Sequence, residues 1–205
     1  METALGSLKT LEERLEILET KIRNPEFRTG GGKANEVNYW VFDYDPRREM
    51  EVRRGIEDIR RKLDGLVPLQ IFDLYDMMID YLEEKHFLDK VYQMEIKKGL
   101  PAVSRAINHT LRMSNDANGL SENRLVEYLK EKADPRSVLF LTGIGKCYPI
   151  LRAQEIFNQV FYNMPKEFMA TPMILFYPGI YTEQELRIFG EMHEDNYYRA
   201  FRIVR

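Results

Sequence analysis

The segment LTGIGKC (141–147) has the strongest likeness to a chemical motif, because a predicted strand enters a glycine-rich turn that ends in Gly-Lys. A phosphate-binding P-loop also needs a glycine five residues before Gly145 and a Ser or Thr after Lys146. Phe140 and Cys147 occupy these two positions. The missing hydroxyl removes a Mg²⁺ ligand, and the missing glycine prevents the backbone from curling around a phosphate. The segment therefore favours a tight turn, although the helix start behind it leaves anion binding open.

Two acidic residues, Asp43 and Asp45, follow the predicted first strand and form a second candidate site. Carboxylate oxygens are suitable Mg²⁺ ligands, so the pair could share an ion. The alternative is structural, with Asp45 capping the helix that begins at Pro46 and Asp43 stabilising the turn. Two acids alone make an incomplete cage, which favours the structural alternative.

These groups should meet at one edge of the sheet. In open α/β sheets, ligands bind beyond the carboxyl ends of the strands, where segment 142–146, segment 177–181 and the two acids would project. A nucleotide- or Mg-binding enzyme or sensor could use this crevice. Its candidate ligand-binding residues are Asp43, Asp45, Gly143, Gly145 and Lys146.

Other reactive side chains form no complete motif. His86, His109 and His193 lack metal-ligand spacing and are expected to be structural or exposed, although His193 could take part in acid–base chemistry. Cys147 beside Lys146 could have a lowered pKa, but buried packing is more usual for a lone cysteine. A Gly-x-Ser-x-Gly motif is missing, so serine-hydrolase chemistry has no basis. The sequence predicts a protein that is not an enzyme and needs no cofactor or metal.

Charge is unevenly distributed along the chain. Residues 47–62 hold seven basic and four acidic side chains, a sum of +3, whereas residues 71–95 hold two basic and seven acidic ones, a sum of −5. The basic run could contact phosphates of DNA, but acids interleave with it and no aromatic residues alternate with its arginines, so a solvated helix face is expected. One basic and one acidic surface would suit a protein partner. The candidate partner-surface residues are Arg47, Arg48, Arg53, Arg54 and Arg61.

Composition limits the class of protein. A chain of 205 residues with 44% hydrophobic and 31% charged residues is long enough for one globular core, and its single cysteine excludes an internal disulfide. The balance of 30 basic and 33 acidic residues lacks the basic excess of a general nucleic-acid binder. The N-terminal residues show no signal peptide, and the apolar runs are shorter than the roughly 20 residues of a membrane helix. We expect a cytoplasmic protein that does not span a membrane.

The first part of the chain predicts a helix, a linker and a strand. Apolar residues recur at helical spacing over 8–23, so an amphipathic helix is expected within 1–26. Its stripe could bind a partner helix, but two heptads are too few for a coiled coil, which favours packing on the domain's own core. A glycine-rich linker over 27–36 follows, then a buried strand over 37–42 and a helix over 46–63.

The middle of the chain, 66–134, is predicted to be a helical insertion without a strand. Its expected helices cover about 69–84, 87–98, 101–113 and 122–132, the last capped by Ser121. The remaining elements are strands over 138–142, 172–177 and 197–204, helices over 149–162 and 182–189, and a polar loop at 192–195.

We therefore predict a single α/β domain over 1–205. Its sheet would be mostly parallel, four-stranded and Rossmann-like, and flanked by helices. A long helical insertion would follow the first strand, and a further helix would precede it.

Four stretches of the chain, in their order and spacing, resemble the BrxB family of BREX phage-exclusion systems. They are VNYWVFDYDPRREMEVRRGI (37–56), VLFLTGIGKCYPILRAQEIFN (138–158), PMILFYPGIYTEQELRIFG (172–190) and DNYYRAFRIV (195–204). Each stretch alone is weak, but their combination is fairly specific. The likeness extends from about residue 10 to the end of the chain.

The resemblance implies a small cytoplasmic component of a bacterial antiviral locus. Members of the family are encoded beside BrxC, a large ATPase, PglX, an adenine-specific DNA methyltransferase, and PglZ, a protein of the alkaline-phosphatase superfamily. Such systems methylate host DNA and block phage replication. The family has no established catalytic set, so no active residue is carried over. The resemblance implies a non-catalytic assembly subunit, with PglZ as the expected direct partner and BrxC and PglX as further candidates.

Overall fold

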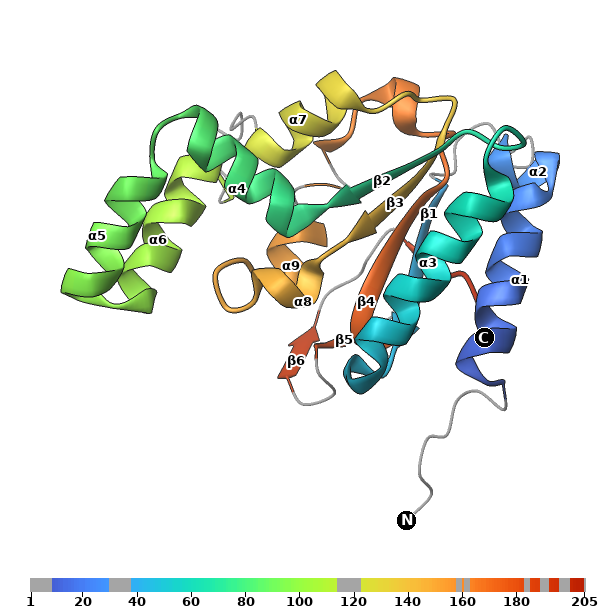
Figure 1. The fold of residues 1–205 in the computed structure, drawn as a ribbon, viewed down its shortest axis with the longest axis horizontal. Coiled ribbons are helices and arrows are strands. Elements are labelled where there is room, and N and C mark those ends of the chain that lie inside the picture. The colour runs from blue at the N-terminus through green and yellow to red at the C-terminus, as the bar shows by residue number, and fades with distance from the viewer. Residues whose placement is uncertain are drawn as a thin grey trace, which may run out of the picture.

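A parallel sheet lies between two layers of helices in the computed structural model (Figure 1). The structure describes residues 9–29, 38–113, 123–157, 160, 163–182, 185–188, 192–195 and 200–204. Parallel strands run side by side in the order β2-β3-β4-β1-β7. Their bounds are β1 Tyr39–Tyr44, β2 Leu69–Asp73, β3 Val138–Thr142, β4 Met173–Thr182 and β7 Phe201–Arg202. The predicted α/β class, with a mostly parallel sheet flanked by helices, is confirmed.

The two faces of the sheet carry two separate apolar cores, because side chains alternate between the faces along each strand. On one face Phe42, Phe140 and Phe176 pack against helices α1 (Leu11–Arg23) and α3 (Glu49–Leu63). The other face is covered by α4 Leu74–Glu84, α6 Leu100–Leu111, α7 Arg124–Lys132, α8 Ile144–Cys147 and α9 Ala153–Ile156. Because both faces are covered, the central strands are almost continuously apolar.

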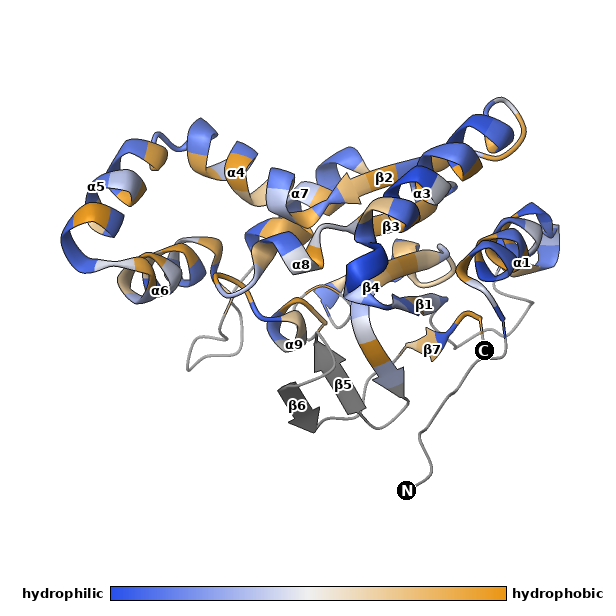
Figure 2. Cartoon of the chain, turned by 60° about the horizontal axis from the view of Figure 1, so that its bottom comes forward, coloured by the Kyte–Doolittle hydropathy of each residue, from blue (hydrophilic) through white to orange (hydrophobic). Residues whose placement is uncertain are grey.

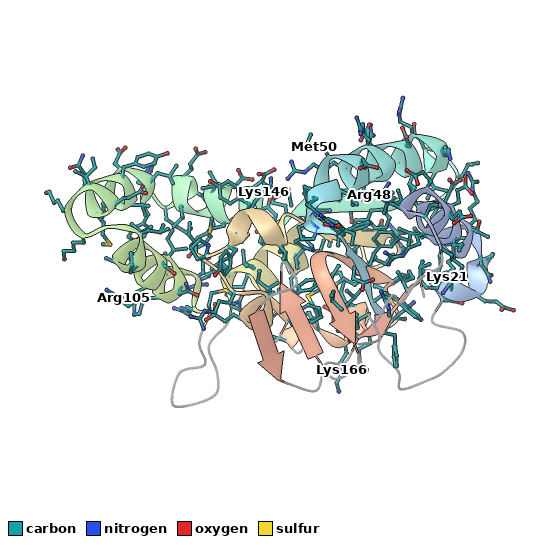
Figure 3. All side chains as sticks on the ribbon, turned by 90° about the horizontal axis from the view of Figure 1, so that it is seen from below. Lys21, Arg48, Met50, Arg105, Lys146 and Lys166 are labelled. Atoms are coloured by element: carbon teal, nitrogen blue, oxygen red, sulfur yellow. The ribbon has the colours of Figure 1, made fainter. Side chains whose placement is uncertain are left out.

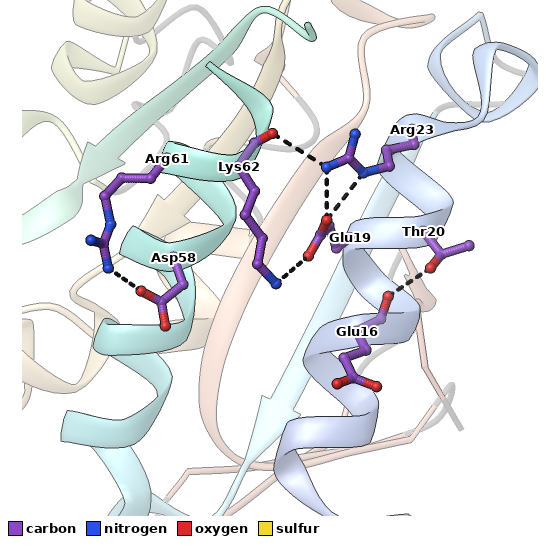
Figure 4. Close-up of polar contacts among 7 residues, drawn as sticks. All are labelled: Glu16, Glu19, Thr20, Arg23, Asp58, Arg61 and Lys62. Carbon is purple, nitrogen blue, oxygen red and sulfur yellow. Dashed lines mark hydrogen bonds and ion pairs between the residues drawn. The ribbon is translucent and has the colours of Figure 1, made fainter.

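The first helix, α1, packs on the body of its own chain. Thr10 and Glu13 form a capping box at its start, and Leu18 and Ile22 are fully buried in the core shared with α3. Glu19 of α1 accepts hydrogen bonds from Arg23 and Lys62, which joins the two helices (Figure 4). The favoured expectation, that this apolar stripe covers the domain's own core, is confirmed.

The predicted helix over 69–84 is wrong in its first part, since Leu69–Asp73 form strand β2 beside β3. Asp73 ends the strand and caps α4, because its carboxylate accepts the backbone N–H groups of Tyr75 and Asp76. The parallel part of the sheet thus has one strand more than the four predicted. The long helical insertion follows β2, and not the first strand.

The rest of this insertion agrees with expectation. Helix α5 (Leu88–Lys98), α6 and α7 match the predicted helices within a few residues. Asn123 caps α7 by accepting two backbone N–H groups, whereas Ser121, the expected cap, lies outside the described residues. Among the described residues, no helix is long and apolar enough to cross a membrane.

The C-terminal part differs from its prediction. A helix is predicted over 182–189, but Thr182 and Glu185 are paired across an antiparallel hairpin of β4 and β5 (Glu185–Ile188). Residues Met192–Asp195, expected as a loop, form strand β6 beside β5. The predicted last strand is confirmed only at Phe201–Arg202, because residues 196–199 lie outside the described part.

Two further boundaries shift. Within the predicted helix over 149–162, the described α-helix α9 begins at Ala153. The expected glycine-rich linker over 27–36 starts inside a short helix, α2 (Pro25–Arg28), and residues 30–37 lie outside the described part.

Helices α5 and α6 form a hairpin that projects from one end of the molecule, which we call the hairpin arm (Figures 1 and 2). The arm is attached mainly through α6, whose Val103, Ile107 and Leu111 are buried. Asn108 Nδ2 donates a 2.6 Å hydrogen bond to the carbonyl oxygen of Ile150 and strengthens this attachment. Helix α5 has no buried residue.

Candidate functional site

The carboxyl ends of the parallel strands do form a candidate ligand site, but the predicted crevice is divided. Asp43 and Asp45 line a pocket of about 480 Å³ together with Gly179 and Ile180, as the predicted grouping of the two acids with segment 177–181 requires. Gly143 instead lines a separate hollow of about 210 Å³ between α3, β2 and β3. The two halves of the predicted site therefore lie in different environments.

Asp43 is a buried carboxylate held by two arginines. Its side chain is only 2% exposed, and Arg14 Nη2 lies 2.7 Å from its Oδ1 atom. Arg202 binds it as a fork, with Nε donating to Oδ1 at 2.9 Å and Nη2 lying 2.6 Å from Oδ2. The backbone N–H of Tyr181 donates to Oδ2 at 3.3 Å. Both carboxylate oxygens are thus occupied by donors, an arrangement that differs from a free metal ligand.

Arg14 is the more deeply buried of the two arginines. Burial lowers its pKa, and the positive charge of Arg202 acts in the same direction, while Asp43 opposes the shift. Its guanidinium carbon lies 4.7 Å from the centre of the Phe42 ring. Its Nε atom is buried and finds no hydrogen-bond acceptor within the described part of the chain. The cluster of Arg14, Arg202 and Asp43 therefore carries one positive charge in excess.

Asp45 has the structural role that the sequence favoured. Its carboxylate accepts the backbone N–H of Arg47 at 3.0 Å and so caps the short 3₁₀ turn η2 (Pro46–Arg48) that leads into α3. Arg47 Nη2 also lies 2.5 Å from Asp45 Oδ2. The hydrogen bonds from Arg47 hold the pKa of Asp45 below its usual value. Asp45 and Arg47 form a neutral, exposed pair at the rim of the Asp43 pocket.

The LTGIGKC segment forms the tight turn that the sequence favoured. Gly143 has φ +81°, and a Cβ atom there would lie 2.2 Å from Asp73 Oδ1. Lys146 Nζ lies 2.6 Å from Asp73 Oδ2 and 3.1 Å from Asp76 Oδ1. Although burial lowers it, the pKa of Lys146 is raised overall by its bonds to these two acids. The lysine is therefore bound by carboxylates of β2 and α4 and not directed at an open phosphate site.

The remaining reactive residues are buried, exposed or undescribed. The side chain of Cys147 is fully buried, and this burial raises its pKa to about 12, so the thiol is protonated at neutral pH. Buried packing, the usual state of a lone cysteine, is thus what the structure shows. His86 and His109 are exposed, and the side chain of His193 lies outside the described residues. Across the described ranges, no group of three or more His, Cys, Asp or Glu residues is placed to hold a metal ion.

Most of the basic run on η2 and α3 is neutralised by its own carboxylates. Arginines pair with acids two to four residues away in the chain, so the net field of this helix is small. The pairs are Arg47–Asp45, Arg48–Glu51, Arg53–Glu49, Arg60–Glu57 and Arg61–Asp58, and Arg48 and Lys62 also reach Glu12 and Glu19 of α1. Figure 4 shows the Arg61 and Lys62 pairs. Among the predicted partner-surface residues, Arg54 alone forms no ion pair within the described chain.

Sequence reasoning did not find Arg14 and Arg202. The signal for Arg14 was present, because it stands three residues after Leu11 and four before Leu18 and hence on the apolar face of α1. A charged residue on such a face needs a buried partner. Nothing in the sequence indicated that this partner was Asp43.

A second candidate surface lies on the hairpin arm. Tyr92, Ile96 and Leu100 are 55%, 78% and 38% exposed, and the first two lie one turn apart on α5. Helices α4 and α5 carry exposed charges of both signs. Those that form no ion pair within the described chain include the acids Asp80, Glu83, Asp89 and Glu95 and the bases Lys90, Lys97 and Lys98.

Comparison with known proteins assigns the chain to a family. The family described as "BREX protein BrxB" matches residues 70–203. BREX protein BrxB of Bacillus cereus (strain H3081.97) is 37% identical over 199 residues, which are 96% of this chain and 99% of the relative. BREX protein BrxB of Escherichia coli O9:H4 (strain HS) is 28% identical over 197 residues, which are 95% of this chain and 92% of the relative. No solved structure matches the chain.

The Asp43 cluster predicts a large effect on stability. In Asp43→Ala, two guanidinium groups lose their shared carboxylate in a buried site, so we expect the free energy of unfolding to fall by about 3 kcal/mol. Chemical denaturation monitored by circular dichroism measures this change. Asp58→Ala, which breaks an exposed pair on α3, is the control and should have little effect. Equal losses in the two variants would contradict the proposed role of Asp43.

The close contact at Gly143 predicts a second effect. Gly143→Ala combines a left-handed backbone with a clash against Asp73, so we expect a loss of at least about 2 kcal/mol in the free energy of unfolding. Gly65→Ala is the matched control, because Gly65 also has positive φ, at +68°, but no atom lies within 4 Å of its added Cβ. It should lose about 1 kcal/mol. If both variants lose the same amount, the contact with Asp73 does not require a glycine.

Proposed function

Because this chain belongs to the BrxB family of BREX proteins, we propose that it is a non-catalytic assembly subunit of a BREX-type phage-defence system and works in the cytoplasm. Its expected direct partner is PglZ, with BrxC and PglX as further candidates. The observation that carries the proposal is the exposed surface of the hairpin arm. The polar edge of the sheet and the hairpin arm support the proposal in different ways.

The polar groups at the sheet edge are engaged with one another. Asp43 is bound by two guanidinium groups, Lys146 by two carboxylates, and Cys147 is buried with a raised pKa. General acids, bases and nucleophiles instead need a free position beside the substrate and a pKa near the working pH. This arrangement favours a structural role for these residues.

The hairpin arm has the character of a docking surface. An exposed apolar patch rimmed by polar residues commonly marks a protein interface, whereas scattered single apolar residues do not. Tyr92 and Ile96 lie on one face of α5, and Leu100 begins the next helix. Tyrosine is enriched at interface centres because it buries a large area at a small entropic cost. A partner that covers this patch would gain apolar burial without competing with the domain's own core.

The charge around the patch defines the partner's chemistry. The acidic part of this surface is the exposed face of α4, where Asp80 and Glu83 form no ion pair within the described chain, whereas α5 and α6 hold four basic and two acidic side chains. A complementary surface would therefore have an apolar centre, with lysine or arginine where it meets α4. We propose that PglZ supplies this surface.

Direct DNA binding is the less supported alternative. Most of the basic residues over 47–62 already pair with carboxylates, and a phosphate would have to displace those partners.

The first test breaks the apolar centre of the arm. Ile96→Lys places a charge at a 78% exposed position, so folding should be unchanged and co-purification with PglZ from a tagged operon should be lost. Met50→Lys is the matched control, because Met50 is 65% exposed on α3, away from the arm that carries Arg105 (Figure 3). A wild-type yield of complex with Ile96→Lys would overturn the assignment of the surface. Recovery of the wild-type protein without PglZ, the ATPase or the methyltransferase would overturn the assembly role.

The second test reverses the charge of the rim. Asp80→Lys with Glu83→Lys should lower the association rate with PglZ about tenfold at low salt, and the difference should shrink as salt rises. Stopped-flow or surface-based kinetics at several salt concentrations measure it. Glu16→Lys with Glu26→Lys makes the same change of net charge on the exposed surface of α1 and α2 and serves as the control. If both pairs slow association equally, the effect comes from net charge and not from the acidic face of α4.

A further inference from the structure

We infer that the pocket at Asp43 binds the phosphate group of a small molecule. The inference is independent of the assembly role, because it rests on Arg14, Arg202 and the pocket they line, and not on the hairpin arm. Four features of this site support the inference. They are its excess positive charge, its unused hydrogen-bond donors, its access from solvent, and carboxylates that are already bound by arginines and so do not suit a metal ion.

The first feature is the excess of positive charge. The side chains of Arg14, Asp43 and Arg202 are 10%, 2% and 23% exposed, so two guanidinium groups and one carboxylate share a largely buried site. Buried charges are normally balanced by partners, because an unbalanced one costs free energy. Asp45 and Arg47 at the rim balance each other and leave the excess unchanged. One further negative charge would neutralise the cluster.

The second feature is the supply of hydrogen-bond donors. A guanidinium group has five N–H donors in a planar fork that matches the geometry of carboxylate and phosphate oxygens. The contacts with Asp43 use one N–H of Arg14 and two of Arg202. The Nε atom of Arg14 is buried and has no acceptor among the described residues. Both arginines also line the pocket, so an oxyanion that entered it would meet guanidinium groups whose donors Asp43 uses only in part.

The third feature is access from solvent. The pocket measures about 480 Å³, within the range of small-molecule sites, and its wall combines Tyr44, Pro46, Gly179 and Ile180 with the charged groups. Ile180 is 48% exposed, so the wall reaches the surface. Arg47, whose side chain is 89% exposed, is positioned at the rim, where it can turn from Asp45 toward a doubly charged phosphate.

The fourth feature is that the site suits an anion better than a cation. Both oxygens of Asp43 already accept bonds from arginines and from the N–H of Tyr181. The carboxylate of Asp45 is bound by Arg47. A Mg²⁺ ion would have to displace guanidinium groups from both acids and would add charge to a site already positive. The same residues that the sequence suggested for Mg²⁺ thus favour an anion.

Ligand binding here would connect the two ends of the fold. Arg14 belongs to α1 and Arg202 to β7, and both contact the ligand-facing carboxylate of β1. A phosphate that binds both arginines stabilises the native arrangement of these three elements, because it binds the folded state alone. Phosphate should therefore raise the melting temperature.

The experiment uses the full chain and inorganic phosphate as the probe. Titration calorimetry and thermal melting compare phosphate with chloride at equal ionic strength, and a parallel titration with AMP distinguishes a nucleotide phosphate from free phosphate. We expect saturable heat and a rise in melting temperature with at least one of them. Tighter binding of AMP would identify a nucleotide as the source, and equal binding would identify the free phosphate group. The absence of both signals with both probes at about 10 mM would overturn the inference.

Two variants with opposite charge changes test the mechanism. Arg14→Gln removes the excess charge and keeps the Asp43–Arg202 fork, so the affinity should fall at least about tenfold. Asp43→Asn removes the competing carboxylate, so phosphate should raise its melting temperature more than that of the wild type. Arg54→Gln removes an exposed, unpaired arginine of α3 and should bind as the wild type does. Unchanged affinity in Arg14→Gln, or weaker stabilisation of Asp43→Asn by phosphate, would overturn the assignment of the site.

Discussion

The carboxylate of Asp43 joins parts of the chain that are far apart in sequence. It binds Arg14 of the first helix, Arg202 of the last strand and the backbone of Tyr181 at the end of β4, while its own strand lies between β4 and β7. These contacts fix α1 and β7 against β1, and Lys21 of α1 adds a hydrogen bond to the carbonyl of Ile203. Because the interaction is ionic and buried, removal of Asp43 would leave two buried guanidinium groups without their shared partner.

Local patterns in the sequence predicted those elements whose apolar period is unambiguous. The strands at β1, β3 and β4 are continuous apolar runs, and α1 and α3 have clear helical stripes. Strand β2 was missed because Leu69, Ile71 and Phe72 continue without a break into the apolar face of α4, and a short apolar run fits either period. The β4–β5 hairpin was missed because Thr182 and Glu185 have the spacing of a capping box. Only the pairing of each segment with a distant strand decides between these possibilities.

The candidate site was predicted only in part, because the sequence does not show which distant residues pair with its charged groups. Parallel strands end at one edge, so the sequence correctly placed Asp43 beside segment 177–181. It could not show that Lys146 is bound by Asp73 and Asp76, because those acids were assigned to the interior of one helix. Nor could it show that Arg14 reaches Asp43 across the edge of the sheet. A long polar side chain binds residues that are close in the fold but distant in the sequence. A sequence motif therefore identifies only one of the two partners.

The summed formal charge of a sequence segment also differs from the charge that its surface presents, because ion pairs within the fold neutralise part of it. The run over 47–62 sums to +3 and the run over 71–95 to −5, which suggests two opposed surfaces. On α3 the cations find acids one helical turn away, and these pairs consume most of the charge locally. On α4 the exposed Asp80 and Glu83 form no ion pair within the described chain, so their field extends into solvent, whereas the lysines of α5 offset its acids. The smaller, buried excess at Arg14 and Arg202 acts over a shorter range but in a lower dielectric, where one charge has a larger effect on a bound ion. Charge density, pairing and burial together therefore determine which surface attracts a partner and which pocket attracts an ion.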